Sequence, residues 1–328
     1  MPRKNSLNAS RSVYNNILET IGNTPIVKIN KITGKDDHIY AKLEFFNPGG
    51  SIKDRMALYI LEHAKRSGEL GESIVENSSG NTGAAIAMIS AVMGKRAIIT
   101  IPDKMSQEKI NLMKAFGAEV IVTPTDVPYD SPDSYYSLAR KKAEEIGAYY
   151  PDQYNNPLNI KCHYETTGPE IWKQMDGKID VLIAGIGTGG TISGIGRYLK
   201  EKNPDIKVIG VDPEGSVFYN YFKEGKIIKP HVYKVEGIGE DYLVKAVDFS
   251  VIDDIVQVND KESFLMARRL AREEGIFAGG SSGSAMVAAM KIASSYKGKN
   301  ILVIFPDSGY RYLSKIYSDE WMKNNNFL

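Results

Sequence analysis

Short apolar runs alternate with longer amphipathic stretches along most of the chain. The apolar runs have the length of buried β-strands, for example 38–44 (HIYAKLE), 96–102 (RAIITIP), 118–124 (AEVIVTP), 207–213 (KVIGVDP) and 300–309 (NILVIFPDSG). The amphipathic stretches predict helices, for example at 81–94, 106–117, 191–203, 261–275 and 284–296. Strands that alternate with helices are joined by crossovers, so we predict an α/β fold with twisted, largely parallel sheets flanked by helices.

Composition and charge are those of an ordinary globular protein. The 328 residues suit two domains better than one. There are 41 Lys+Arg and 40 Asp+Glu, a net charge of +1, so we expect no nucleic-acid and no membrane partner. The polar start, residues 1–12, lacks the apolar core of a signal peptide, and no apolar run approaches the roughly 20 residues of a membrane helix.

Cysteine is scarce and histidine is scattered. Cys162 is the single cysteine, so no disulfide forms within the chain, and we expect a reducing compartment such as the cytoplasm. We interpret Cys162 as a packed small side chain rather than a nucleophile. The 4 histidines show no metal-ligand spacing, so we predict no metal site.

Five turns that follow predicted strands or precede predicted helices are rich in small and polar residues. They are 47–53 (NPGGSIK), 76–83 (ENSSGNTG), 185–194 (GIGTGGTISG), 277–284 (FAGGSSGS) and 305–311 (FPDSGYR). Parallel α/β sheets bind ligands beyond the carboxyl ends of their strands. The ligand site is therefore expected among these turns. A further turn-rich stretch, 123–136, is predicted to be a surface loop.

The turn at 185–194 has the make-up of a phosphate-binding loop. Its backbone N–H groups, the Thr188 and Thr191 hydroxyls and the dipole of the next helix all suit an anion. The turn also matches G-x-G-x-x-G from Gly185, and Asp212 follows about 20 residues later, so a nicotinamide dinucleotide is an alternative ligand. That alternative leaves the other polar turns without a role.

Lys53 stands at the predicted start of a helix, where a cation opposes the helix dipole. One interpretation is an ordinary solvated lysine. The other is a lysine that forms an imine with an anionic aldehyde cofactor, pyridoxal 5'-phosphate (PLP). The phosphate of PLP would need only the 185–194 turn, which leaves the remaining turns for the ring and the substrate.

Four motifs in order along the chain carry a family resemblance: NPGGSIKDR, SSGNTG, GTGGT and PDS. Together they resemble the cystathionine β-synthase and cysteine synthase family, the fold type II (tryptophan synthase β-like) PLP enzymes. The resemblance extends from IGNTPIVKI to the C-terminus. DSPDS, VDPEGSV, VEGIGEDY and the last 17 residues are more similar to cystathionine β-synthase than to cysteine synthase.

This resemblance implies an organisation and a set of partners. It implies a larger PLP-binding domain at 1–48 and 155–328 and a smaller, mobile substrate-binding domain at 49–154. The implied partners are small amino-acid and thiol substrates and a second copy of the chain in a homodimer. The first 40 residues hold no Cys, so the thiolate-ligated haem of animal enzymes is not expected. Regulatory modules beyond Leu328 are not expected either.

The resemblance also implies roles for individual residues. Lys53 attaches the cofactor and serves as general base, Asn81 binds the phenolic oxygen of PLP, and Ser308 faces its pyridine nitrogen. The phosphate is held by Gly187, Thr188, Gly189, Gly190 and Thr191. The substrate is bound by Ser78, Ser79, Thr82, Gln153, Gly237, Glu240 and Asp241. Glu240 stands where animal enzymes have tyrosine, so it and Asp241 either assist a poor leaving group or are solvated.

The implied activity is β-replacement through an aminoacrylate. We expect L-serine and L-homocysteine to give cystathionine. Synthesis of cysteine from O-acetylserine and sulfide, or release of sulfide from cysteine, is the alternative. A nicotinamide-dependent oxidoreductase is a distant alternative that rests on the glycine pattern and Asp212 alone. A non-catalytic sensor would be expected to have lost Lys53 or SSGNTG, and both are present.

Overall fold

The computed structural model describes residues 13–128 and 130–328. Residues 1–12, whose polar sequence predicts no signal peptide, lie outside the described residues. None of the helices in the described ranges is long and apolar enough to cross a membrane.

The larger of two sheets has six strands in the order β1-β2-β9-β6-β7-β8. Its strands are β1 (Ile26–Lys28), β2 (His38–Leu43), β6 (Val181–Gly185), β7 (Lys207–Pro213), β8 (Asp254–Val258) and β9 (Asn300–Phe305). β1 pairs antiparallel with β2, and every other pairing in this sheet is parallel. Alternate residues of β6 enter different apolar clusters, so both faces of the sheet are buried.

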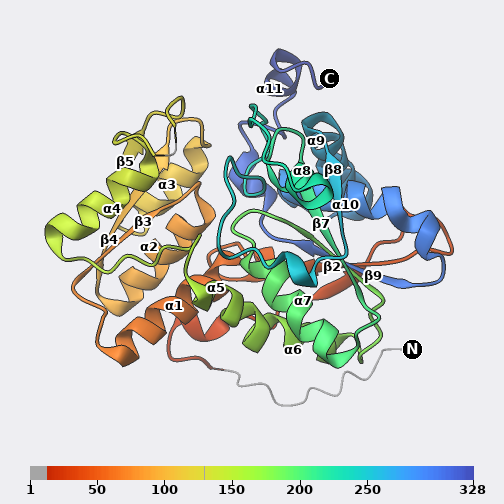
Figure 1. The fold of residues 1–328 in the computed structure, drawn as a ribbon, viewed down its shortest axis with the longest axis horizontal. Coiled ribbons are helices and arrows are strands. Elements are labelled where there is room, and N and C mark those ends of the chain that lie inside the picture. Colours follow the sequence, from red (N-terminus) through yellow and green to blue (C-terminus); the bar gives the residue numbers. More distant parts are fainter. Residues whose placement is uncertain (1–12, 129) are drawn as a thin grey trace.

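The smaller sheet is parallel and has three strands. They are β3 (Ser73–Asn77), β4 (Arg96–Pro102) and β5 (Glu119–Thr123), in that order. The helices that accompany it are α1 (Lys53–Ser67), α2 (Asn81–Met93), α3 (Gln107–Ala115) and α4 (Tyr135–Ile146). Figure 1 shows these elements as one lobe beside the lobe of the larger sheet.

The larger sheet is flanked by the remaining helices. They are α5 (Pro157–Cys162), α6 (Gly168–Gln174), α7 (Gly190–Lys202), α8 (Phe218–Glu224), α9 (Asp260–Arg269), α10 (Gly280–Ile292) and α11 (Asp319–Asn324). A π-helical turn, His163–Thr167, joins α5 to α6. Apolar residues of α10 pack on one face of the sheet and those of α7 pack on the other.

The predicted fold class is confirmed, and several element boundaries differ. The strands at 96–102 and 207–213 have the predicted bounds. The helix predicted from Ser284 begins at Gly280 instead, because the small polar residues there pack inside the protein as the first turn of α10. The loop prediction at 123–136 overlaps α4, which already begins at Tyr135. β8 and α4 were not predicted.

The two sheets use different parts of the chain. The smaller sheet takes residues 73–123, and the larger sheet takes residues 26–43 and 181–305. The domain division at 48/49 and 154/155 remains our proposal. Its mobility is likewise a prediction.

Candidate active site

A cavity of about 380 Å³ lies among the turns that the sequence singled out. A smaller pocket of about 30 Å³ has several lining residues in common with it. The predicted site residues that line the larger cavity are Lys53, Ser79, Asn81, Thr82, Gln153, Gly187, Thr188, Gly237, Glu240 and Asp241. Gly189 and Thr191 line the smaller pocket. The structure thus brings together twelve residues from separate turns.

Lys53 is the first residue of α1 and lines both spaces. The turn before it is fixed to the end of β9, because the Ile52 N–H donates to the Pro306 carbonyl (2.8 Å). No ion pair or hydrogen bond joins the Lys53 ammonium to any residue that the structure describes. Burial lowers the pKa of Lys53 below its usual value, although the Asp307 and Glu240 carboxylates oppose this shift. Lys53 therefore lines the cavity as a lysine without a fixed charge partner among the described residues.

The turn before α2 supplies one wall of the cavity. Asn81 and Thr82 are the first two residues of α2, so their side chains lie where its backbone N–H groups are free. The Thr82 hydroxyl donates to the Gln153 side-chain oxygen (2.6 Å), and the Gln153 amide donates to the Asn77 carbonyl (3.0 Å). This wall presents neutral hydrogen-bonding groups next to the positive end of a helix dipole, which suits a carboxylate.

Ser78 does not line the cavity, which corrects its predicted substrate contact. Its hydroxyl oxygen accepts hydrogen bonds from the N–H groups of Gly80 (3.0 Å) and Gly83 (2.8 Å). Gly80 has a φ of +132°, which only glycine adopts readily. Ser78 therefore shapes the turn from inside, while its neighbour Ser79 lines the cavity.

The glycine loop forms the floor of the smaller pocket. A Cβ at Gly187 would lie 2.6 Å from the Gly237 carbonyl oxygen, and one at Gly189 would lie 2.3 Å from the Val247 side chain. Both glycines are needed for packing of the loop against the 237–247 segment. Gly190 does not line either space; it begins α7 and lies against Asn159.

Ser308 lies outside the cavity, which corrects its predicted contact with the cofactor ring. Its hydroxyl oxygen accepts from the Tyr310 N–H (3.2 Å) at the start of a short 3₁₀ turn, and the residue lines a separate groove. Ser281, in the first turn of α10, lines both the cavity and the smaller pocket instead. Ser281 belongs to the polar turn FAGGSSGS, which the sequence indicates as part of the ligand site without assigning a role to any of its residues.

Asp307 is buried next to this site and does not line it. The Asn81 amide donates to one Asp307 oxygen (2.7 Å), and the Tyr312 hydroxyl donates to the same oxygen (2.6 Å). The Asn81 side-chain oxygen is buried and has no hydrogen-bond partner among the described residues. The Asn81 amide nitrogen carries a second N–H with no acceptor among the described residues, so Asn81 can donate to a bound group.

Glu240 lines the cavity beside a group of tyrosines. The Tyr136 hydroxyl donates to its side-chain oxygen (3.3 Å), and Tyr154 and Tyr242 both pack edge-on against the Tyr136 ring. Burial and the nearby Asp241 charge raise the pKa of Glu240 to about 8. Glu240 is therefore a carboxylic acid that carries a proton near neutral pH, whereas Asp241 is exposed.

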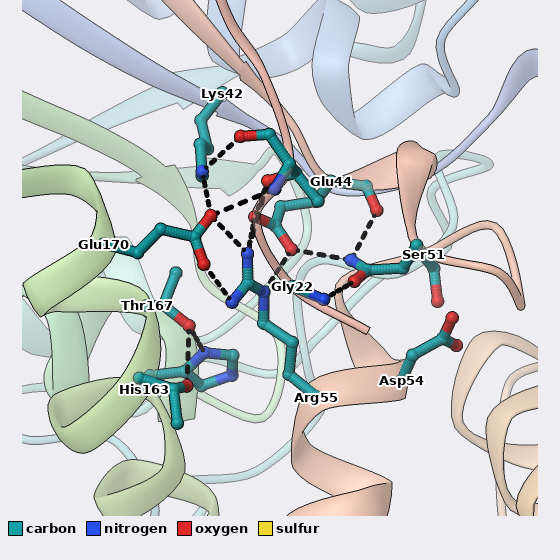
Figure 2. A network of polar contacts seen from close by, with 12 residues as sticks. Gly22, Lys42, Glu44, Ser51, Asp54, Arg55, His163, Thr167 and Glu170 are labelled. Carbon is teal, nitrogen blue, oxygen red and sulfur yellow. Dashed lines mark hydrogen bonds and ion pairs between the residues drawn. The ribbon is translucent and has the colours of Figure 1, made fainter. Parts of the chain in front are cut away.

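A second polar cluster lies around Arg55, two residues after Lys53 in the chain (Figure 2). The Arg55 guanidinium forms two-pronged ion pairs with Glu44 (2.7 and 2.9 Å) and Glu170 (2.8 and 2.9 Å). Lys42 binds Glu170, the Thr24 carbonyl (2.7 Å) and Gln174 (2.7 Å). The positive charges of Lys42 and Arg55 thus balance the negative charges of Glu44 and Glu170 in the interior. No local sequence pattern predicts this cluster, because its members are far apart in the chain.

Two further sequence interpretations concern Asp212 and Cys162. Asp212 is fully buried and accepts a hydrogen bond from the Tyr219 N–H (2.9 Å), so it is not presented to a ribose in the cavity. This removes the acidic residue on which the dinucleotide alternative depended. Cys162 is buried and burial raises the pKa of its thiol to about 12, which agrees with a packed side chain.

Comparison with known proteins decides between the remaining ligand classes. Residues 17–307 match the family described as pyridoxal-phosphate dependent enzymes. The chain belongs to this family. It is 46% identical to cystathionine β-synthase of Mus musculus over 98% of this chain and 58% of the relative. It is 45% identical to cystathionine β-synthase of Saccharomyces cerevisiae over 95% of this chain and 64% of the relative. The chain thus spans about three fifths of the length of these curated relatives.

A solved structure shares the fold of this PLP-dependent enzyme. An O-ureido-L-serine synthase superposes with a TM-score of 0.86 at 35% identity, covering 95% of this chain and 99% of that chain. The family resemblance, the fold type and the PLP dependence expected from the sequence are therefore confirmed.

The residues present fit PLP. Lys53 offers an amine without a fixed partner among the described residues, and Asn81 offers the second N–H of its amide, the first being bound to Asp307. The loop 187–191 closes a small pocket with glycines at which a Cβ would collide with the protein. Ser281 offers a hydroxyl to both spaces. These groups match an aldehyde, a ring and a phosphate in one ligand.

Proposed function

We propose that this enzyme carries out β-replacement on an amino acid, joining L-serine to L-homocysteine to give cystathionine and water. In this reaction the serine hydroxyl leaves the β-carbon, and the homocysteine sulfur forms the new bond there. The names of the relatives support the proposal, as does the shape and charge of the cavity.

The observation that carries the choice of thiol is the mixed charge of the side chains that line the cavity. The lining includes cations and charged carboxylates together: Lys104, Lys234, Lys315, Glu236 and Asp241. Glu236 is itself held between Lys109 (2.6 Å) and Lys315 (2.7 Å). A second amino acid presents an ammonium and a carboxylate, which match both signs. Sulfide presents neither group.

Serine is proposed to bind with its carboxylate at the α2 wall. Ser79, Asn81, Thr82 and Gln153 line that wall with neutral hydrogen-bonding groups at a helix N-terminus. The Thr82–Gln153 hydrogen bond holds two of these side chains in place before substrate arrives. Ser78 acts behind them by shaping the turn.

PLP, when bound, supplies the electron sink that makes the α-proton acidic and the β-substituent labile. Lys53 is proposed to attach it and then, as a free amine, to take the proton from the substrate Cα and return it at the end. A burial-lowered pKa favours this role, because the neutral amine is the base. Gly187, Thr188, Gly189 and Thr191, with the backbone of Gly190, would hold the phosphate, and Ser281 would take the ring-nitrogen contact first given to Ser308.

Glu240 is proposed to assist the departing hydroxyl. Hydroxide is a poor leaving group, and a protonated carboxyl that lines the cavity can donate to it. Asp241 would keep that proton on Glu240 through its own negative charge. The homodimer, the cytoplasmic location and the division into two domains are further proposals that rest on the resemblance alone.

A product assay tests the proposed reaction. The PLP-loaded enzyme is mixed with serine or O-acetylserine and with homocysteine, cysteine or sulfide, and products are identified by mass spectrometry. We expect cystathionine from serine and homocysteine at the highest kcat/KM. If homocysteine yields no cystathionine with either amino acid while sulfide yields cysteine, the cysteine synthase alternative replaces the proposal.

A further inference from the structure

Each threonine of the phosphate loop contacts a buried side chain from the segment that contains α5 and the following π-turn. Thr188 contacts Asn159, and Thr191 contacts His163. Asn159 and His163 are four residues apart and are at most 1% exposed, so they lie on one buried face of that segment. They do not line the cavity, so any effect of these two side chains on a bound ligand passes through the two threonines.

Two glycines of α7 bring the loop onto this face. A Cβ at Gly190 would lie 2.0 Å from the Asn159 side-chain oxygen. A Cβ at Gly194 would lie 2.3 Å from the Ile160 carbonyl oxygen and 2.7 Å from the His163 Cβ. These glycines are required for contact between the two helices, which is a different requirement from close approach of an anion.

The Asn159 amide has a fixed orientation. Its Nδ2 donates to the Gln153 carbonyl oxygen (2.8 Å) and to the Thr188 Oγ1 (3.0 Å). A backbone carbonyl only accepts, so the NH₂ side must face this way. The Thr188 oxygen thus accepts a hydrogen bond from Asn159, which does not line the cavity. Its proton has no acceptor among the described residues and is available to a group in the cavity, which Thr188 lines.

His163 repeats this arrangement at the second threonine. Burial, with the charges of Lys53 and Arg55, lowers the pKa of His163 well below its usual value, so the ring is neutral and carries one N–H. Its Nδ1 lies 2.9 Å from the Thr167 Oγ1 (Figure 2), and its Nε2 lies 3.3 Å from the Thr191 Oγ1. Which nitrogen carries the proton decides whether Thr191 accepts or donates.

The neighbouring Thr166 indicates the tautomer. The Thr166 hydroxyl donates to the Cys162 carbonyl (2.7 Å), so it has no proton for Thr167. The Thr167 hydroxyl has two acceptors in reach, His163 Nδ1 at 2.9 Å and Thr166 Oγ1 at 3.4 Å, and the second is too long for a good O–H···O bond. Thr167 therefore donates to Nδ1, and Nε2–H donates to Thr191.

We propose that Asn159 and His163 are positioning residues for the cofactor phosphate: each donates a hydrogen bond to a threonine oxygen of the loop, which commits both threonine protons to the anion. A phosphate offers only acceptors at neutral pH. A threonine whose proton was turned back toward the helix would present a lone pair to it and repel it. The proposal rests on the PLP dependence of the chain and not on the identity of its amino-acid substrates.

The first test compares two variants of His163 in the full chain. His163→Gln keeps an N–H donor in reach of Thr191, and His163→Asn does not. The dissociation constants of PLP and of pyridoxal, which lacks the phosphate, are measured for each. We expect His163→Asn to weaken PLP binding about tenfold while pyridoxal binding changes by less than about twofold, and His163→Gln to stay within about twofold of wild type for both.

A general structural disturbance in His163→Asn would weaken the binding of PLP and of pyridoxal equally, and that result would overturn the proposal. Unchanged PLP binding in His163→Asn would overturn it as well. The second test reads the tautomer in the wild-type protein and uses a variant only to assign the signals. In ¹⁵N-histidine-labelled holoenzyme, the ring nitrogen shifts report the tautomer, and the His163 signals are identified by their loss in His163→Gln. We expect a protonated Nε2 and an unprotonated Nδ1; the reverse assignment would contradict the argument.

Discussion

Lys53 and Arg55 are two cations in the first turn of one helix, and the protein treats them in opposite ways. Successive helical residues turn by about 100°, so side chains two positions apart lie on nearly opposite faces. Arg55 enters the balanced cluster of Figure 2, where Glu44 and Glu170 each bind it twice. Lys53 enters the cavity and finds no ion-pair partner among the described residues.

The pKa values show what this difference means. In the cluster, burial raises the pKa of Glu170, but the hydrogen bonds and charges of Arg55 and Lys42 outweigh burial and lower it to about 2. At the cavity, burial dominates and lowers the pKa of Lys53. Fixed partners keep a buried group charged, whereas a group without them is ready to lose its charge. The first arrangement stabilises the fold, and the second makes a lysine reactive.

Replacing each cation by methionine should separate the two roles most strongly. Arg55→Met leaves two carboxylates without their main partner, and we expect a loss of about 3–5 kcal/mol in the free energy of unfolding. Lys53→Met removes no ion pair, so its stability should stay within about 1 kcal/mol of wild type, while turnover falls by roughly 10²–10⁴-fold or more. Urea unfolding of the PLP-free proteins measures the first effect. Equal destabilisation by both variants would contradict the comparison.

Acid should weaken the cluster through Glu170. Its pKa is about 2 in the folded protein against an ordinary value of 4.5, so its contribution is complete above about pH 4.5 and is lost as the pH falls toward 2. The shift corresponds to about 3 kcal/mol. Glu170→Gln should therefore flatten the dependence of unfolding free energy on pH in that window. An unchanged slope would show that the pairing does not persist in solution.

Glu240 should show the opposite dependence in the reaction. Because its pKa is raised to about 8, it carries a proton at neutral pH and loses it as the pH rises past 8. We expect turnover of serine, but not of O-acetylserine, to fall over that range. Glu240→Gln should slow the serine reaction by roughly 10²-fold and the O-acetylserine reaction much less. Asp241→Asn should have a smaller effect on the rate and should move the fall in serine turnover to lower pH, because the Asp241 charge helps to raise the pKa of Glu240. Equal slowing of both substrates would remove Glu240 from leaving-group assistance.

The smallest expected effect is the difference in PLP binding and turnover between alanine variants of Ser281 and Ser308. Ser281 lines both spaces and Ser308 lines neither. Ser281→Ala should weaken PLP binding or lower turnover by about tenfold, the scale of one hydrogen bond to the cofactor. Ser308→Ala should change both by less than about twofold, because it removes only the cap of a short turn. If the two results were exchanged, the original assignment of Ser308 would stand.

These serines also show how far sequence reasoning reached. The order of strands and helices, the parallel sheets and the polar turns followed from residue patterns, because each depends on neighbours in the chain. The choice between Ser281 and Ser308 did not, because it depends on α10 beginning at Gly280, four residues before the apolar pattern starts. Propensity gives no signal for small polar residues that are helical only because they are buried.

Other features depended on contacts between distant parts of the chain. The Arg55 cluster joins residues 24, 42, 44, 55 and 170, and no local pattern marks them as a group. Gly190 was assigned to the anion on the strength of its loop, whereas the structure shows that Asn159 leaves no room for a side chain there. A glycine motif indicates positions where the backbone leaves no room for a side chain. Only the fold shows which group approaches the backbone there.

The most direct test of the account is to identify the lysine that holds PLP. Lys42 and Lys109 are fully buried and paired with Glu170 and Glu236, whereas Lys53 has no ion-pair partner among the described residues. Borohydride reduction of the PLP-loaded enzyme, followed by digestion and peptide mass analysis, fixes the cofactor to its lysine. The account predicts modification at Lys53 alone. Modification at Lys42, Lys109 or another lysine, with Lys53 unmodified, would contradict it.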